Sequence, residues 1–388
     1  MEKSDAAADN PPAVLVTPDL DASCPFEGPE KLLEIWFHPA PLSADPQSGL
    51  RAIDRHDWEN MLSVVKCKVL SMISGHEMDA YLLSESSFFV FPHKVILKTC
   101  GTTLNLLGLP RILEIAADGC GYRDVWRCFY SRKSFMFPER QHGPHREWKD
   151  EMDYLDNLFP KHNGAAYAVG KVNGDHWLLY LTTPPGDDQF SNPDEPYNLH
   201  TSSIESSQTL ASPNENDPVM VSVDLDQDYT IELLMTKLAA PARRPFFFLD
   251  EDLKDFTPEQ DSEGFTGVAQ AKGAFVSSQL GISSIFPQHL TKLDSYAFEP
   301  CGYSANGIVS YGEETSNVGL ATNGEGYYTI HVTPEEGWSY ASFECNVPIM
   351  PADFHSPTAK NLAKDTKGNF PNLETLIQRV VDIFQPGP

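Results

Sequence analysis

The sequence predicts a fold that mixes helices with strands, of the α/β or α+β class. Between residues 58 and 182, short apolar runs of strand type, such as residues 94–97 and 177–180, alternate with helical runs such as residues 111–116. A similar order of elements begins again after residue 218. Hydrophobic residues make up 41% of the 388, which is ample for a large core or for two fused halves.

The first ordered element is expected at residues 29–37. Residues 1–24 are rich in Ala, Asp and Pro without periodicity and are interpreted as a flexible leader. Pro29 then opens an apolar stripe, which predicts a helix because proline is tolerated in the first helical turn. The stripe comprises Leu32, Leu33 and Trp36, with Glu27, Glu30 and Glu34 on a different side.

Two segments interrupt the later part of the chain. Residues 184–218 hold Pro, Ser, Asn and Asp but no Lys or Arg, which is typical of a disordered insertion. Residues 311–326 are rich in Gly, Asn and Glu and are interpreted as a loop. The remaining expected elements are a strand over residues 219–225, a helix over 230–235, a strand over 327–333 and a helix over 372–381.

Composition restricts the partners and the compartment. Fifty-five acidic residues against 28 Lys and Arg give a formal charge of −27, which disfavours nucleic acid and anionic membranes and suits a cationic ligand such as a polyamine or a sulfonium compound. Seven scattered cysteines without a C-x-x-C spacing indicate neither a disulfide framework nor a zinc site. No segment has the length or pattern of a signal peptide or membrane span, so we expect a cytosolic protein.

The tetrapeptide Ser84-Glu85-Ser86-Ser87 lies between two apolar runs and predicts the corner of a β-hairpin. A serine hydroxyl held at such a corner can reach the preceding carbonyl. Attack by Ser86 would convert the Glu85-Ser86 amide into an ester, which is nucleophilic catalysis directed at the chain itself. The alternative is an ordinary polar turn.

A cysteine and a lysine share one face of the strand expected near residue 97. Strand alternation places Lys98 and Cys100 on one side and Leu97 on the other. Cys100 is either a small buried hydrophobe or a proton donor beside a cavity, where Gly101 permits close approach of a ligand.

Alternation also gives polar faces to two later strands. These faces comprise Thr329, His331 and Thr333 on one strand, and Tyr340, Ser342 and Glu344 on the other. His331 is either a hydrogen-bonded structural residue or a base, and Glu344 could be simply solvated.

Two further motifs are interpreted as loops. Residues 298–307 are dense in Gly, Pro, Ser and Asn, which is typical of a turn or of a close approach to a ligand. His142 and His145 flank Gly-Pro, which gives no helical or strand spacing of metal ligands, so a loop is favoured. The sequence contains no Gly-rich phosphate loop and no G-x-S-x-G motif.

Taken together, six ordered blocks closely resemble the eukaryotic S-adenosylmethionine decarboxylase family. The blocks are residues 26–34, 83–87, 97–103, 129–133, 300–304 and 329–335. The resemblance implies a four-layer α-β-β-α sandwich, with two antiparallel sheets face to face, helices outside and two similar halves. The family usually continues past residue 387 with a further strand, whereas this sequence ends at Pro388, so an edge strand is expected to be missing.

The resemblance also implies a proenzyme that cleaves itself between Glu85 and Ser86 into residues 1–85 and 86–388. Ser86 would become a pyruvoyl group, Ser304 would stabilise the rearranging intermediate, and His331 would remove the α-proton that allows the ester to break. The pyruvoyl carbonyl would form a Schiff base with S-adenosylmethionine and accept the electrons released with carbon dioxide. No metal and no pyridoxal phosphate are expected.

Further roles follow from the same resemblance. Cys100 matches the proton donor of decarboxylation. Phe26 and Phe298 would stack on the adenine of the substrate, and the backbone of Leu83 would contact the same base. The carboxylates that would lie near the ribose and the sulfonium are those of Glu27, Glu30 and Glu335. The product would be the aminopropyl donor for spermidine and spermine synthesis.

Members from animals and fungi resemble this chain in a second pocket, which binds putrescine as an activator. The matching residues are Glu34, Lys98, Ser131, Asp228, Thr230, Glu232 and Glu344. Plant-like members place basic side chains where this chain has Leu32 and Phe129, so we expect stimulation by putrescine. We also expect a dimer of cleaved pairs. Two alternatives stay open: a degenerate paralogue that only regulates an active decarboxylase, and a hydrolase built on Cys100 and His331.

Overall fold

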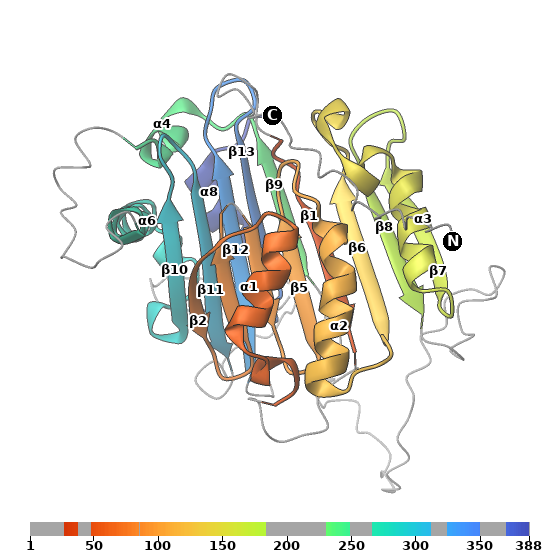
Figure 1. Ribbon diagram of the computed structural model, residues 1–388. Helices are drawn as coiled ribbons and strands as arrows, with labels where there is room; N and C mark the ends of the chain where they lie inside the picture. The colour runs from red at the N-terminus through yellow and green to blue at the C-terminus, as the bar shows by residue number, and fades with distance from the viewer. Residues whose placement is uncertain are drawn as a thin grey trace, which may run out of the picture.

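The computed structural model shows two β-sheets packed face to face, with helices on the outer sides (Figure 1). The structure describes residues 27–37, 48–84, 86–183, 230–248, 266–311, 324–349 and 370–387. An eight-stranded sheet has the order β2-β3-β4-β5-β1-β6-β8-β7, and a five-stranded sheet has the order β10-β11-β12-β13-β9. All pairs of neighbouring strands run antiparallel. The expected α+β sandwich is confirmed.

The first sheet is built from the N-terminal half of the chain. Its strands are β1 (Lys31–Trp36), β2 (Val69–Ser74), β3 (Asp79–Leu83), β4 (Ser86–Val90), β5 (Lys94–Thr99), β6 (Arg127–Lys133), β7 (Asn163–Gly170) and β8 (His176–Thr183). The helices α1 (Arg55–Val64), α2 (Leu109–Cys120) and α3 (Trp148–Leu158) cover its outer face (Figure 1). Apolar residues of these helices and of alternate strand positions form one core, which includes Trp58, Phe88, Leu97, Ile112 and Tyr130.

The second sheet comes from the C-terminal half. Its strands are β9 (Ile231–Thr236), β10 (Thr291–Ala297), β11 (Tyr303–Tyr311), β12 (Gly324–Thr333) and β13 (Tyr340–Cys345). The helices of this half are α4 (Ala240–Arg243), α6 (Thr266–Leu280) and α8 (Leu373–Phe384). Leu376, Val380 and Phe384 of α8 pack with the outward residues of the strands, such as Ile330 and Phe343.

The space between the sheets holds a smaller apolar cluster and many polar side chains. Phe89 of β4 stacks on Tyr327 of β12, with ring centroids 4.2 Å apart. Asn306 of β11 donates to the Tyr81 carbonyl of β3 at 3.0 Å. Because strand side chains alternate, each sheet sends apolar residues to its outer helices and polar residues into this shared layer. Many of the buried polar groups of the fold therefore lie between the sheets.

Two segments expected to be helical are strands. Residues 29–37 contain β1, which pairs with β5 on one side and with β6 on the other. Residues 230–235 fall largely in β9, which pairs with β13. Short apolar runs do not distinguish the two periods, and strand pairing overrides local helix preference. In β1 the supposed stripe is split, because Leu33 lies in the outer core while Leu32 packs against the inter-sheet cluster.

Most of the other expected elements are confirmed. Residues 94–97, 177–180 and 327–333 lie in β5, β8 and β12, residues 111–116 lie in α2, and residues 372–381 match α8 to within a residue at its start. The leader, the insertion at 184–218 and the strand expected over 219–225 lie outside the described residues, as do residues 312–323 of the expected loop. Residue 311 belongs to β11, and residues 324–326 belong to β12.

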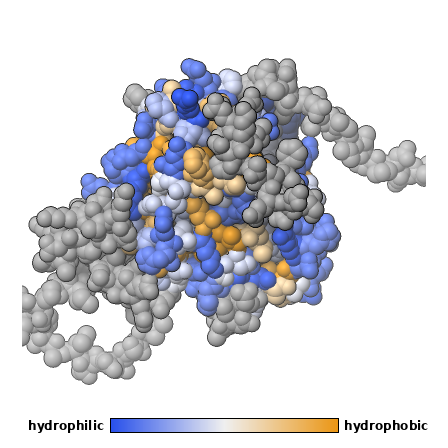
Figure 2. Space-filling model, turned by 90° about the vertical axis from the view of Figure 1, so that its left-hand side faces the viewer, coloured by the Kyte–Doolittle hydropathy of each residue, from blue (hydrophilic) through white to orange (hydrophobic). Residues whose placement is uncertain are grey.

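The side of the sandwich bounded by β2 and β10 is the left-hand side of Figure 1. Figure 2 shows this side as a surface that is hydrophilic at its margins and carries a band of hydrophobic residues between them. Here the sheets are joined by a hydrogen bond from Ser71 of β2 to Asp294 of β10. Gln270 of α6 also donates to Asp294, at 3.0 Å.

Candidate active site

The predicted hairpin is confirmed, and it places Ser86 as the first residue of β4. Leu83 at the end of β3 pairs with Ser86, so only two residues connect the strands. The described residues give the Oγ of Ser86 no nitrogen or oxygen partner, although the side chain is only 1% exposed. Strand alternation directs it to the outer side of the sheet, where Phe88 also points. The thiol of Cys67 lies beside it, and burial, partly offset by contact with Ser86, raises the pKa of that thiol to about 11.

A network of uncharged groups surrounds His331 between the sheets. Nε2 lies 3.0 Å from the Oγ of Ser87 and 2.9 Å from the Oγ1 of Thr329. Nδ1 lies 3.0 Å from the Oγ of Ser304. The Oγ of Ser87 donates in turn to the Oδ1 of Asn306 at 2.6 Å. The structure thus brings His331 and Ser304 together as expected, and the serine that meets this histidine is Ser87.

His331 is neutral at physiological pH. Burial, and then the positive charge of Lys98, lower the pKa of its imidazole to about 3. A histidine with this pKa keeps a free lone pair on one ring nitrogen above about pH 3, as a base requires. Among the described residues, its ring nitrogens bond to hydroxyl groups alone, and Cys100 is not one of their partners. This geometry provides no thiol and imidazole pair of the kind that a cysteine hydrolase uses.

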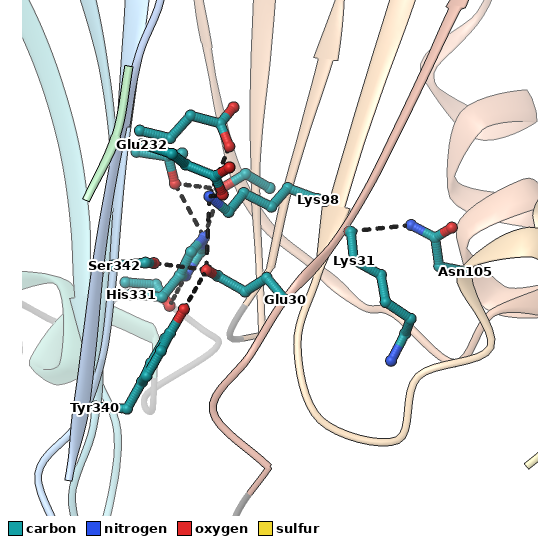
Figure 3. A network of polar contacts seen from close by, with 12 residues as sticks. Glu30, Lys31, Lys98, Asn105, Glu232, His331, Tyr340 and Ser342 are labelled. Carbon is teal, nitrogen blue, oxygen red and sulfur yellow. Dashed lines mark hydrogen bonds and ion pairs between the residues drawn. The ribbon is translucent and has the colours of Figure 1, made fainter. Parts of the chain in front are cut away.

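A second network, charged rather than neutral, lies in the same layer (Figure 3). The ammonium of Lys98 on β5 contacts Glu344 of β13 at 2.6 Å, Glu232 of β9 at 3.1 Å and Glu30 at 3.6 Å. Glu30 also accepts hydrogen bonds from Ser342 at 2.7 Å and Tyr340 at 3.0 Å. Glu344 is fully buried, so the alternative of a simply solvated Glu344 is wrong.

The protonation of this network reflects competition between burial and charge. Burial would lower the pKa of Lys98, but Glu30, Glu344 and Glu232 together raise it above its ordinary value. Burial raises the pKa of Glu232 to about 7, and it also raises the pKa of Glu30 despite the nearby Lys98. Three carboxylates around one ammonium leave an excess of negative charge, which a further cation would neutralise.

Cys100 and Glu27 lie in neighbouring segments, because the N–H of Gly101 donates to the Glu27 carbonyl at 3.1 Å. Cys100 directly follows β5 and is 6% exposed. The carboxylate of Glu27 accepts hydrogen bonds from the backbone N–H groups of Met136 and Phe137, at 2.7 and 2.8 Å. Burial raises the pKa of Glu27, and these two hydrogen bonds oppose the rise. Glu27 is therefore anchored in the fold by the loop after β6.

The other predicted site residues are more dispersed. Glu335 follows β12 and has a buried Oε2 without a hydrogen-bond partner in the described part of the chain. Phe298 is partly buried in the turn between β10 and β11, whereas Thr230 is exposed just before β9. Glu34 contacts Trp36 at 2.6 Å and Lys94 at 3.6 Å, so these contacts do not join it to Lys98. Ser131 lies opposite Leu32, and Phe26, Glu85 and Asp228 lie outside the described residues.

Sequence reasoning missed Ser87 and Asn306 as members of the His331 network, and it placed Thr329 on the polar face of His331 without assigning it to the site. Asn306 lies two residues after Ser304 on β11, so alternation could have identified it. No local signal indicated Ser87, because its contacts join strands 219 or more residues apart in the chain. His145, in a 3-10 turn as expected for a loop, is buried against Glu151 at 2.8 Å.

Within the described ranges, no group of three or more His, Cys, Asp or Glu side chains is arranged to hold a metal ion. None of the helices in the described part of the chain is long and apolar enough to span a membrane.

The family model for adenosylmethionine decarboxylase matches residues 23–388. Three similar proteins are all named S-adenosylmethionine decarboxylase proenzyme. The one from Saccharomyces cerevisiae is 34% identical over 95% of this chain and 81% of its own, and the one from Drosophila melanogaster 37% over 93% and 80%. The one from Xenopus laevis is 33% identical over 93% of this chain and 80% of its own. The match over residues 23–388 and the identity to these three proteins show that this chain belongs to the adenosylmethionine decarboxylase family.

Proposed function

We propose that this protein decarboxylates S-adenosylmethionine to S-adenosyl 3-(methylthio)propylamine, the aminopropyl donor for spermidine and spermine synthesis. The family assignment over residues 23–388 is the observation that carries the proposal. The buried site supports it, because neutral His331 and a carboxylate-rich network lie between the same two sheets. A substrate with a sulfonium charge suits such acidic surroundings.

The prosthetic group of this reaction would be a pyruvoyl group made from Ser86. Ser86 fits that role because it heads β4 immediately after a two-residue connection, and its buried hydroxyl has no nitrogen or oxygen partner in the described residues. A ketone at this position supplies a carbonyl that withdraws the electrons released with carbon dioxide. Cleavage between Glu85 and Ser86 would divide the protein into residues 1–85 and 86–388.

Self-cleavage needs a nucleophile, a stabilising donor and a base. In the proposed step the Oγ of Ser86 bonds to the Glu85 carbonyl carbon, and the Glu85-Ser86 C–N bond breaks to give an ester. Ser304 would donate to the oxygen that gains charge, and His331 would take the α-proton so that the ester C–O bond breaks. This elimination would leave a carboxylate on Glu85 and dehydroalanine at residue 86, and hydrolysis of its imine form by water would release ammonia and leave the ketone. The hydroxyl of Ser86 points to the other side of the sheet from His331, so the hairpin must rearrange for this chemistry.

Decarboxylation would use residues at the end of β5 and around Glu27. Cys100 would return a proton to the substrate carbon, and its 6% exposure means that bulk water has little access to this step. Glu27, Glu30 and Glu335 would meet the ribose and the sulfonium, and Phe26 and Phe298 would hold the adenine. The buried, unpartnered Oε2 of Glu335 is available for such a contact.

Release of carbon dioxide from carboxyl-labelled S-adenosylmethionine tests the activity. We expect release by the wild-type protein and loss of at least about a hundredfold in Cys100→Ala, as for removal of a general acid. Cys120→Ala, which changes a partly buried cysteine on α2, is the matched control and should keep full activity. No release by freshly purified, cleaved protein would contradict the proposal and favour a regulatory paralogue.

We also propose that the network around Lys98 binds putrescine. Lys98, Glu232 and Glu344 of the predicted pocket are in contact, with Glu30 as a fourth member. The excess of carboxylates suits a diamine with two positive charges. Glu344→Gln should abolish stimulation by putrescine, measured as the ratio of decarboxylation rates with and without it. A wild-type ratio of one would sink the idea.

A second copy of the chain is the proposed partner. Strand β7 ends the eight-stranded sheet, and on it Tyr167 is 48% and Val169 is 59% exposed. An exposed apolar edge strand favours pairing with another strand. Light scattering should give the mass of a dimer of cleaved pairs, and Val169→Lys should give half that mass. A wild-type monomer would contradict the assignment.

We further propose a cytosolic location, which fluorescence microscopy of a tagged protein can check.

A further inference from the structure

Lys31 is a buried ammonium outside both networks described above. Its side chain is fully buried, and Figure 3 shows it on the opposite side of β1 from its neighbour Glu30. Its Nζ donates to the Gly101 carbonyl at 2.7 Å and to the Oε1 of Gln141 at 3.5 Å. In the described part of the chain, no carboxylate lies within ion-pair distance of this Nζ. Burying a charge with so few partners is costly, which suggests a functional reason.

The group that Lys31 holds is the turn after Cys100. The carbonyl of Cys100 accepts a hydrogen bond from Thr103 at 3.4 Å, and Gly101 has a φ of +60°, which favours glycine. The N–H of Gly101 donates to the Glu27 carbonyl at 3.1 Å. The side chains of Lys31 and Gln141 both donate to the carbonyl of Gly101. Two segments of the chain, residues 27–31 and the loop that holds Gln141, therefore fix the residue that follows Cys100.

The charges around Lys31 connect it to the same cysteine. Burial lowers the pKa of Lys31 to about 8; a negative charge on Cys100 opposes this most strongly, followed by Glu151 and Glu27, while Arg132 reinforces it. The interaction is reciprocal, because a thiolate that stabilises an ammonium is stabilised by it to the same extent. Further charged or titratable groups face the two partners: His145 beside Lys31, and Tyr340 beside Cys100.

We propose that Lys31 is a positioning residue for Cys100. Lys31 holds the turn that presents the Cys100 thiol, and its positive charge favours the thiolate left after proton donation. In that step the S–H bond of Cys100 breaks, the proton goes to the substrate carbon, and the electron pair stays on sulfur. The inference rests on the proposed function, which assigns the proton transfer to Cys100.

Alkylation of Cys100 as a function of pH tests the electrostatic part of this inference. The folded protein is treated with iodoacetamide at a series of pH values, and the modified peptide that contains Cys100 is quantified by mass spectrometry. Removing an adjacent positive charge disfavours the thiolate, so Lys31→Met should raise the midpoint of alkylation by about one pH unit or more. Lys31→Arg keeps the charge and should return the midpoint towards the wild-type value.

Lys94→Met is the matched control. It removes a second buried lysine from the far end of the same strand pair, where Lys94 lies opposite Trp36 while Thr99 lies opposite Lys31. Its alkylation midpoint should equal that of the wild type. If Lys31→Met does not fold, Lys31→Gln removes the charge with a polar side chain and should give the same upward shift.

The outcomes separate this inference from the proposed function. Alkylation requires no turnover, so the midpoints can be measured even if the protein releases no carbon dioxide. Equal midpoints in the wild type and in a folded Lys31→Met or Lys31→Gln would overturn the role of Lys31, whatever the activity. An upward shift should be accompanied by a parallel shift in the pH profile of kcat in an active enzyme, which a purely structural role of Lys31 would not produce.

Discussion

The networks around His331 and Lys98 are both buried between the same two sheets, yet they differ in charge. His331 is surrounded by the hydroxyls of Ser87, Ser304 and Thr329, and its pKa is lowered to about 3. Lys98 is surrounded by three carboxylates and remains charged. The first arrangement suits proton transfer, which needs a neutral base, and the second suits binding of a cation.

The two networks are also physically connected. His331 lies opposite Ser342 in the register of β12 and β13, and Ser342 donates to Glu30 at 2.7 Å. Glu30 in turn contacts Lys98, whose positive charge contributes to the lowered pKa of His331. A cation that binds among the carboxylates would therefore be felt at the base. One buried layer therefore holds a neutral network of hydroxyl groups around a histidine and an acidic network around a lysine.

The largest effect is expected from His331→Ala. Loss of the base should slow cleavage of newly made chains by at least a hundredfold, the usual contribution of a general base being about 10²–10⁴. Pulse-chase labelling followed by gel electrophoresis measures the rate at which the full-length chain disappears. His145→Gln changes another buried histidine, on the outer side of the first sheet, and should cleave normally. Normal cleavage of His331→Ala would remove this residue from the mechanism.

Lys98→Met should reduce stability strongly, because it leaves Glu30, Glu232 and Glu344 buried without their ammonium. Breaking a buried charge network by removing one partner costs about 3–5 kcal/mol in the free energy of unfolding. Urea denaturation of variants in a Ser86→Ala background, which should stay as one chain, measures the loss. Lys94→Met should lose less, since the ion pair of Lys94 with Glu34 measures 3.6 Å, whereas Lys98 contacts Glu344 at 2.6 Å. Equal losses would show that the carboxylate network is not special.

The difference in the free energy of unfolding between Lys98→Met and the protein that keeps Lys98 should also become smaller as the pH falls. The pKa of Glu232 is raised to about 7 and that of Glu30 is raised as well. A carboxylate whose pKa is raised by folding binds a proton more readily in the folded state than in the unfolded chain. The folded state is therefore stabilised relative to the unfolded chain as the pH falls below that raised pKa. Protonation then removes the unbalanced negative charge. A gap that stays constant between pH 8 and pH 5 would contradict this account.

The smallest effect concerns putrescine. Because Glu232 should gain a proton below about pH 7, the pocket loses negative charge there and should bind a dication less tightly. The concentration of putrescine that gives half-maximal stimulation should therefore rise as the pH falls from 8 to 6. Glu232→Gln, which cannot ionise, should flatten that dependence. An unchanged half-maximal concentration in the wild type would exclude Glu232 from the binding of putrescine.

Much of the site could be predicted from the sequence, because period-two alternation needs no knowledge of the fold. It placed His331 with Thr329 and separated Lys98 from Leu97, and the structure confirms both. The failures have a common cause. The segment around Leu33 has a helical pattern by itself. It forms a strand because β5 and β6, which are distant in the sequence, pair with it on either side.

The orientation of Ser86 could not be predicted for a related reason. The hairpin was evident from local residues, but which face of it meets His331 depends on how the second sheet packs against the first. The structure places Ser87 against His331 and Ser86 against the outer core beside Cys67. Only the assembled sandwich shows that Ser86, the proposed nucleophile, and His331, the proposed base, lie on different sides of the sheet.

The central claim is that the chain cuts itself at one bond and makes its own prosthetic group. Intact-mass measurement of the purified protein tests this directly. We predict two chains, with masses that correspond to residues 1–85 and to residues 86–388 beginning with a pyruvoyl group in place of Ser86, and only one full-length chain in Ser86→Ala. A wild-type protein that stays as one chain of 388 residues with an unmodified Ser86 would contradict the account.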